Sequence, residues 1–186
     1  FGDTGSSIYA NSVLGARTNF EGGPSALAAS FTGRTPMYGL HLERNRIPNK
    51  AFLVKFRPSN LSDWGALGGI IGQEMMSYWD MPIIYGLDIR PSSDELKHFG
   101  AAMASFGSTP MFHIDGVTPE SHIHQNLNIK LKTITNLDLK KFYEGFLPDD
   151  NQLDVIVFSA PQLSLDEMRV LSEMIDGKKV HPDISL

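Results

Sequence analysis

Residues 81–114 read MPIIYGLDIRPSSDELKHFGAAMASFGSTPMFHI, and this stretch decides the fold class. The apolar run Pro82–Leu87 predicts a short buried strand, and Ser92–Glu95 forms a capping box at the start of a helix. The apolar residues of that helix fall on one face, namely Leu96, Phe99, Met103 and Phe106. Gly107 ends the predicted helix, and Met111–Ile114 predicts the next strand. A strand, an amphipathic helix and another strand in succession indicate an α/β fold with parallel strands.

The same alternation continues on both sides of this stretch. Helices are predicted at 24–32, where Gly33 closes the helix, at 64–79, from 136 to the turn at Pro148, and at 165–175. Strands are predicted at 38–42, 51–56, 129–134 (on an edge) and 153–158. We therefore expect a layered α/β/α domain with a mostly parallel sheet, in which residues 1–186 form a single α/β domain or lobe.

The pattern also makes specific predictions for burial. The glycines within 64–79 indicate close approach to a neighbouring backbone. The apolar run 153–158 predicts a strand covered on both faces. The helix before Pro148 should face inward with Leu139, Phe142, Tyr143 and Phe146. The helix after the capping box Ser164–Glu167 should bury a stripe made of Leu165, Met168, Leu171, Met174 and Ile175.

The composition of the 186 residues is that of an ordinary globular protein, with 41% hydrophobic and 20% charged residues. A formal net charge of −5 and a pI near 5.6 argue against nucleic acid as a main partner. The sequence has no apolar run long enough to span a membrane and no secretion signal, so we expect a cytoplasmic protein. It contains no cysteine, which excludes disulfides and thiolate ligation of iron by these residues.

The segment Tyr9–Pro24, YANSVLGARTNFEGGP, concentrates polar side chains that suit a binding site. Arg17, Asn19 and Glu21 alternate along it, so in an extended segment they point to one side. The final GGP predicts the start of a helix, whose N–H groups beside a guanidinium would bind a carboxylate or a phosphate. Two plainer interpretations remain open: a polar turn between a strand and a helix, and a surface salt bridge between Arg17 and Glu21.

Three blocks of the sequence have a distinctive pattern of residues. The first block is YANSVLGARTNFEGGPSALA at 9–28, continued by TGRTPMYGLHL at 32–42. The second is LKHFGAAMASFG at 96–107 with MFHIDGVTPE at 111–120. The third is DVIVFSAPQLSLDE at 154–167. Together these blocks resemble the aconitase X family, a group of iron–sulfur hydro-lyases. The resemblance covers most of the chain, and the blocks occur in the order that the family has.

The chain departs from the family pattern at two places. Phe20 stands where the family usually has arginine. Ser159–Gln162 stands where the family usually has Gly-Cys-Pro-His, so Ala160 replaces a cysteine that looks like a ligand of the family's iron–sulfur cluster. The resemblance therefore implies a cluster in the parent family, and we expect this cysteine-free segment to hold none by itself.

The resemblance implies that the chain is an internal fragment of a longer catalytic subunit that dehydrates a β-hydroxy acid. We favour mevalonate 5-phosphate, in the mevalonate pathway of isoprenoid biosynthesis, as the substrate. Two alternatives stay open: a 3-hydroxyproline dehydratase, and a degenerate non-catalytic paralogue that lacks the cluster. The implied partner is the small swivelling subunit or domain of the family, which supplies the catalytic base. The segment alone should not be competent for the reaction.

The resemblance assigns substrate binding to a set of residues in the first block: Asn11, Ser12, Arg17, Thr18, Asn19, Glu21, Gly22, Gly23 and Arg34. Arg17, Asn19 and the amides of the two glycines would form an anion clamp. Asn11 and Ser12 are also suited to satisfying the backbone of the turn. Arg34 is a second anion contact or a plain loop arginine.

His113 is predicted as the catalytic residue of this segment, acting as acid, base or orienting group. His113–Glu120 and Ser159–Ser164 both follow predicted strands, and ligands of parallel sheets bind where strands end, so we expect both on the ligand-binding edge. Glu120 is also suited to capping a turn. The spacing of His113, His122 and His124 invites a metal interpretation, but nothing fixes the three on one face, and we predict no metal site.

Overall fold

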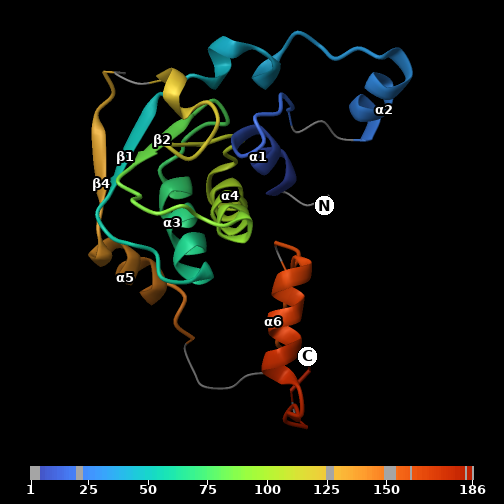
Figure 1. The fold of residues 1–186 in the computed structure, drawn as a ribbon, viewed down its shortest axis with the longest axis vertical. Helices are drawn as coiled ribbons and strands as arrows, with labels where there is room; N and C mark the ends of the chain where they lie inside the picture. Colours follow the sequence, from blue (N-terminus) through green and yellow to red (C-terminus); the bar gives the residue numbers. More distant parts are fainter. Residues whose placement is uncertain are drawn as a thin grey trace.

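The computed structural model describes residues 5–19, 23–124, 128–148, 154–159, 161–182 and 184–185. Figure 1 shows the arrangement of its elements. The α-helices are α1 (Gly5–Ser12), α2 (Gly23–Thr32), α3 (Leu61–Gln73), α4 (Ser93–Gly107), α5 (Asn136–Glu144) and α6 (Leu165–Ile175). The 3₁₀ helices are η1 (Gly39–His41), η2 (Glu43–Arg46) and η3 (Ser121–His124). The strands are β1 (Lys50–Val54), β2 (Pro82–Tyr85), β3 (His113–Ile114) and β4 (Leu131–Ile134). Within the described residues, no helix combines the length and the apolar character that crossing a membrane requires.

The strands form one four-stranded sheet in the order β3-β2-β1-β4, and each pair is parallel. Ala51 of β1 pairs with Ile83 of β2 and with Leu131 of β4, and Ile83 also pairs with His113 of β3. Helices α3 and α4 are the crossover connections that parallel neighbours require. The predicted α/β class, the parallel sheet and the edge position predicted for the strand at 129–134 are therefore confirmed.

Helices α3 and α4 pack against one face of the sheet and against each other (Figure 1). A Cβ built at Gly68 of α3 would lie 2.2 Å from the carbonyl oxygen of Phe99 in α4, and one at Gly72 would lie 2.9 Å from that of Met103. The close backbone approach predicted from these glycines is confirmed. The two helices and the sheet share one apolar core, which includes Phe52, Trp64, Leu67, Ile71, Ile84, Phe99, Met103 and Ile114.

Helix α4 has the predicted capping box. The Ser92 hydroxyl accepts the N–H of Glu95, and the Glu95 carboxylate accepts the N–H of Ser92. Gly107 is the last helical residue, but the left-handed residue that terminates the helix is Ser108, with φ 51°. Glycine at 107 serves the packing instead, because a Cβ there would lie 2.2 Å from the carbonyl oxygen of Gly72.

The strand predicted at 38–42 is wrong, because the chain forms the 3₁₀ helix η1 there. Gly39 has φ +57°, a left-handed conformation that interrupts an extended strand and that glycine adopts without a Cβ clash. The side chain of Asn19 accepts the N–H of Leu40 at 2.7 Å, so this N–H is paired with a side chain and not with the backbone of a neighbouring strand. The helix predicted at 24–32 is confirmed as α2, with Gly33 at φ +62° after its end.

Helix α5 is less buried than predicted. Its Phe142 is half-buried over Gly69, where a Cβ would lie 2.4 Å from the Phe142 ring. The Tyr143 hydroxyl donates a 2.8 Å hydrogen bond to Asp63 of α3. All of α5 is described and none of its residues is fully buried, while Phe146, just after the helix, is 62% exposed. The inward face is therefore only partly covered.

The chain after residue 154 is packed much less tightly than its apolar pattern predicts. The covered strand at 153–158 is wrong: Val155 makes one isolated parallel bridge with Ser185, and Val157 is 73% exposed. Leu153 lies outside the described residues. The buried stripe of α6 is also wrong, because all of α6 is described and none of its residues is buried; Leu165 is 75% exposed. Figure 1 shows α6 extending away from the sheet.

Candidate functional site

The last residues of α1 anchor the loop that carries the predicted binding residues. Asn11 and Ser12 are each 1% exposed. The Asn11 side chain donates to the carbonyls of Thr18 (2.9 Å) and Pro110 (3.1 Å) and accepts the Thr18 N–H (3.0 Å). The Ser12 hydroxyl accepts the N–H of Phe112 at 2.9 Å. These contacts favour the backbone-satisfying role for both residues: Asn11 closes the loop to Thr18 and, with Ser12, ties it to the chain entering β3.

Arg46, which the sequence analysis did not single out, joins this loop to the rest of the protein. Its side chain is 0% exposed. Nε and Nη2 donate to the two carboxylate oxygens of Glu120 at 2.9 and 2.6 Å, a bidentate ion pair. Nη1 donates to the carbonyl of Leu40 (3.1 Å) and to Asn11 Oδ1 (3.4 Å), and Nη2 donates to the Asn11 carbonyl (3.2 Å). A guanidinium has five N–H groups, and these five bonds use them.

Glu120 is therefore the partner of Arg46, not the cap of a turn. Burial alone would raise the pKa of Glu120, but the hydrogen bonds and the charge of Arg46 outweigh it and hold the pKa below its usual value. The turn after β3 is capped by Thr118, whose hydroxyl oxygen accepts the N–H of Ile114 at 2.9 Å. A carboxylate buried against a guanidinium stays ionised, which fixes the charge of this pair at neutral pH.

His113 is also 0% exposed, and its Nε2 lies 2.8 Å from the carbonyl oxygen of Arg46. This bond ties β3 to the backbone beneath the Arg46–Glu120 pair. Of the three predicted roles, the geometry favours the orienting one, because a buried ring bonded to a carbonyl does not face solvent. Its catalytic role stays a prediction.

Arg17, Thr18 and Asn19 lie together on the loop that Asn11 closes. Arg17 bonds through Nη2 to Glu43 of η2, and its side chain is 40% exposed, so part of it faces solvent. The structure therefore shows a salt bridge between Arg17 and Glu43. The interpretation that paired Arg17 with Glu21 stays open, because Glu21 lies outside the described residues. Asn19 bonds to the backbone of η1 through Leu40, as described above.

The remaining predicted binding residues are not gathered at this loop by any contact that the structure describes. Gly22, like Glu21, lies outside the described residues. Gly23 begins α2 and Arg34 follows it, and both are exposed. All of α2 is described and none of its residues is buried; Figure 1 shows it standing apart from α3 and α4. The assignment of these glycines and Arg34 to substrate binding stays a prediction.

A second cluster of charged residues joins the third sequence block to α4. Glu167, in the first turn of α6, pairs with Lys97 and bonds to His98 Nε2 at 2.6 Å. Lys97 also donates to the Gln162 carbonyl at 3.0 Å. Burial alone would raise the pKa of Glu167, but hydrogen bonds from Lys97, the Ser164 backbone and His98 lower it to about 2. Ala160 lies outside the described residues.

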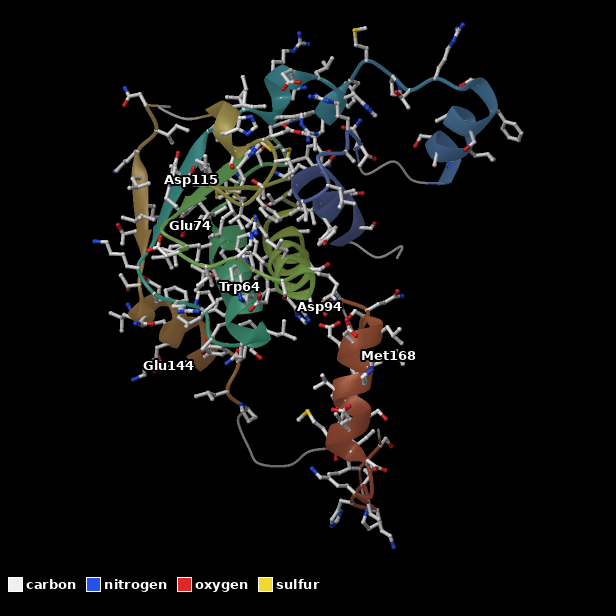
Figure 2. All side chains as sticks on the ribbon, viewed as in Figure 1. Trp64, Glu74, Asp94, Asp115, Glu144 and Met168 are labelled. Atoms are coloured by element: carbon white, nitrogen blue, oxygen red, sulfur yellow. The ribbon has the colours of Figure 1, made fainter. Side chains whose placement is uncertain are left out.

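The same contact is visible at the helix ends. Ser164 caps α6 through Glu167 and donates a 2.9 Å hydrogen bond to Asp94 at the start of α4. Figure 2 shows Asp94 beside the first turn of α6, with Met168 farther along α6 and beyond the body of the domain. A largely apolar groove of about 850 Å³ runs between α6 and the first residues of α3 and α4. Helix α6 is thus held by polar contacts at one end.

The loop 11–19 lies near the N-terminal ends of the strands, because its anchors Arg46 and Pro110 precede β1 and β3. At the C-terminal ends of the strands lies a cavity of about 470 Å³, lined by residues 54–58 and 86–89. The prediction that 113–120 lies at the C-terminal ends of the strands, where ligands bind, is correct for the first part of this segment and wrong for its last residue. Asp115 follows the end of β3, whereas Glu120 is bonded to Arg46, near the N-terminal ends of the strands.

No metal site is found among the residues that the structure describes, where no three His, Asp or Glu side chains are grouped to hold an ion. Iron–sulfur clusters are held mainly by cysteine thiolates, and the whole sequence has none. The residues of this chain do not fit such a cluster on their own.

Sequence reasoning missed Arg46 and Lys97 because it treated charged residues as solvated. Arg46 lies in a polar turn with Arg44 and Asn45, a setting typical of a surface loop. The available signal was Glu120, an acidic residue whose predicted place after a buried strand needs a counter-charge. Which arginine supplies it depends on how the loop folds back, which periodicity does not encode.

Comparison with protein families gives two matches along the chain. The model of the aconitase X first domain matches residues 2–44, and that of the aconitase X second domain matches residues 48–144. Both sequence blocks that precede residue 144 fall within these matches. The prediction that the chain forms a single domain or lobe is not tested by them.

Among known proteins, the chain is similar to the phosphomevalonate dehydratase large subunit of Thermococcus kodakarensis, at 41% identity over 90% of this chain and 42% of that protein. It is 33% identical to the cis-3-hydroxy-L-proline dehydratase of Hypocrea jecorina over 96% of this chain and 32% of that protein. The crystal structure of Thermococcus kodakaraensis aconitase X in its holo-form superposes with a TM-score of 0.82 at 36% identity, covering 93% of this chain and 44% of that one. The chain spans less than half the length of these relatives.

Proposed function

Because this chain belongs to the aconitase X family, we propose that it forms part of a hydro-lyase that dehydrates a β-hydroxy acid. The observation that supports the proposal is the loop 11–19 of the family's first block, which carries a partly exposed Arg17 and is closed by hydrogen bonds between Asn11 and Thr18. A guanidinium binds a carboxylate or phosphate with charge-assisted hydrogen bonds, and a rigid loop reduces the ordering cost of doing so.

Mevalonate 5-phosphate is the substrate that we favour. Relatives named phosphomevalonate dehydratase large subunit reach 41% identity, whereas the cis-3-hydroxy-L-proline dehydratases reach 33% and 30%. Both substrates carry a carboxylate, and the first also carries a phosphate, so an arginine-bearing loop suits either. A 3-hydroxyproline substrate remains the alternative on this evidence.

In the proposed reaction this chain binds and orients the substrate. Arg17 would hold its anionic group, exchanging part of its contact with Glu43 for the ligand, and Asn19 would keep the loop against η1. The base that removes the proton would come from a small partner subunit. The name large subunit of the relatives supports the existence of such a partner. The family's iron–sulfur cluster would supply Lewis-acid chemistry, held by residues outside this cysteine-free chain.

A degenerate, non-catalytic paralogue is the second candidate. Ala160 stands where the family's third block usually has a cysteine, and no other cysteine in the chain replaces it. Such a protein would keep the binding loop and lose the dehydration chemistry. Substrate binding without turnover is the property that separates it from the enzyme.

The test uses the full-length protein, reconstituted anaerobically with iron and sulfide and mixed with its small subunit. Visible and EPR spectra report a cluster, and product formation from mevalonate 5-phosphate or cis-3-hydroxy-L-proline reports activity. A cluster with turnover of the first substrate supports the proposal, and turnover of the second alone replaces the substrate assignment. Binding without cluster or turnover would establish the degenerate paralogue.

A further inference from the structure

We infer that Arg46 is a positioning residue for the substrate-binding loop, which it holds through Asn11, so that replacing it weakens substrate binding more than it slows the chemical step. The inference rests on the proposed function for its substrate and deepens it by adding a residue that does not itself face solvent. It is carried by the geometry of Arg46 and by its place in the chain.

The first observation is that Arg46 has no capacity left to bind substrate. Its five N–H groups all have protein acceptors, and its side chain is 0% exposed. A buried charge is costly even when it is paired, and an apolar replacement of a whole pair is often neutral or stabilising. A bidentate pair buried here is therefore better explained by the geometry that it fixes than by stability alone.

The second observation is the position of Arg46 between the two family segments, which end at residue 44 and begin at residue 48. Its guanidinium bonds to Asn11 and Leu40 of the first segment and to Glu120 of the second, while its own carbonyl contacts His113 of the second. Arg46 thus links the two segments, alongside the contacts of Asn11 with Pro110 and of Ser12 with Phe112.

The third observation is the path from Arg46 to the loop. Nη1 contacts Asn11 Oδ1, the same oxygen that accepts the Thr18 N–H, and Nη2 contacts the Asn11 carbonyl. Arg46 therefore contributes to the orientation of the amide that closes the loop, together with the Asn11 bond to the Pro110 carbonyl. It also holds the Leu40 carbonyl, and the Leu40 N–H is bonded to Asn19. Both ends of the segment Thr18–Asn19 are fixed through neighbours of Arg46.

Arg46→Lys is the informative substitution, because lysine keeps the charge but replaces the planar five-donor fork with one ammonium nitrogen. Lysine can still pair with Glu120, but it cannot hold the two carboxylate oxygens, Leu40 and Asn11 in the same geometry. Glu120→Gln is the second variant and removes the charge while keeping the shape. Arg44→Gln, an exposed arginine in the same 3₁₀ helix, is the matched control.

Two measurements on the full-length protein with its small subunit test the inference. Hydrogen exchange compares the peptide 13–19 with the core helix peptide 96–104. We expect Arg46→Lys to accelerate exchange at 13–19 and leave 96–104 unchanged. Steady-state kinetics with mevalonate 5-phosphate should show KM raised roughly 10- to 100-fold with kcat changed far less, since losing a hydrogen bond to a charged ligand weakens binding by about this factor and leaves the reacting groups in place. Arg44→Gln should change neither.

Two results would overturn the inference: faster exchange in both peptides with KM unchanged, which is a purely structural role, or no change at 13–19 in either variant. If Arg46→Lys does not fold, Glu120→Gln is measured in the same way and must show the same local acceleration. Exchange needs no substrate, so a wild-type protein without turnover contradicts the proposed function and leaves the loop test intact.

Discussion

Helices α3 and α4 in the body of the domain and the outlying helices α2 and α6 all carry apolar side chains, but they differ in what covers those side chains. Helices α3 and α4 bury Leu67, Phe99 and Met103 against the sheet. Helices α2 and α6 are described in full and bury no residue, although Phe31 and Leu165 are large apolar side chains, 81% and 75% exposed. An apolar stripe on a helix therefore predicts a face suited to burial, while the partner that covers it must be supplied by the rest of the fold.

The largest expected difference between the two regions is in the cost of deleting a methionine. Met103 is 0% exposed in α4, and Met168 is 56% exposed in α6. Met103→Ala should lower the free energy of unfolding by about 2–5 kcal/mol, because it leaves a core cavity. Met168→Ala should change it by less than about 0.5 kcal/mol. Urea unfolding of both variants measures this, and equal losses would mean that α6 is covered in solution.

A second contrast lies within α3. Gly68→Ala should destabilise the chain by about 1–3 kcal/mol, since its Cβ would overlap the Phe99 carbonyl of α4. At Gly65, where nothing lies within 4 Å of a built Cβ, alanine should stabilise the helix by about 0.5–1 kcal/mol. Opposite signs in thermal unfolding of these variants would confirm the close helix contact. Two stabilising substitutions would contradict it.

A smaller effect is expected from acid at the contact that holds α6. The folded-state pKa of Glu167 is about 2 against an ordinary value of 4.5, so its contribution is present in full above about pH 4.5. It is lost progressively as the pH falls from there through about 2, because Glu167 must then be protonated. Hydrogen exchange in α6, corrected for the intrinsic pH dependence, should rise over this range before exchange in α4.

Glu167→Gln is the control for this titration. It removes the ionisable group, so the exchange of α6 should already be fast at neutral pH and should lose its dependence on acid. An unchanged, slow exchange of α6 in that variant would show that the Lys97 and His98 contacts do not hold the helix.

The sequence predicted the elements that are local and repetitive. The capping boxes at Ser92 and Ser164, the parallel α/β architecture and the close packing at Gly68 all follow from short patterns. It did not predict η1, because the left-handed Gly39 is stabilised by Asn19 from a distant part of the chain. Tertiary contacts of this kind override local propensity.

The candidate site was predicted in part for the same reason. The loop of Arg17, Thr18 and Asn19 was recognised from its polar residues and its resemblance to a family. Its support by Arg46 and Glu120 depends on two turns that meet from positions 46 and 120 of the chain. A buried ion pair looks like two surface charges in the sequence, since only the fold determines which charges meet.

The most direct test of the account is the affinity of the full-length protein for mevalonate 5-phosphate, measured by calorimetry for the wild type, Arg17→Gln and the control Arg44→Gln. The account predicts that Arg17→Gln binds roughly 10- to 100-fold more weakly, because a hydrogen bond to a charged group contributes about 1.5–3 kcal/mol. Arg44→Gln should bind as the wild type does, and both variants should keep the unfolding temperature. Equal affinity of all three proteins would contradict the assignment of the loop 11–19 to substrate binding.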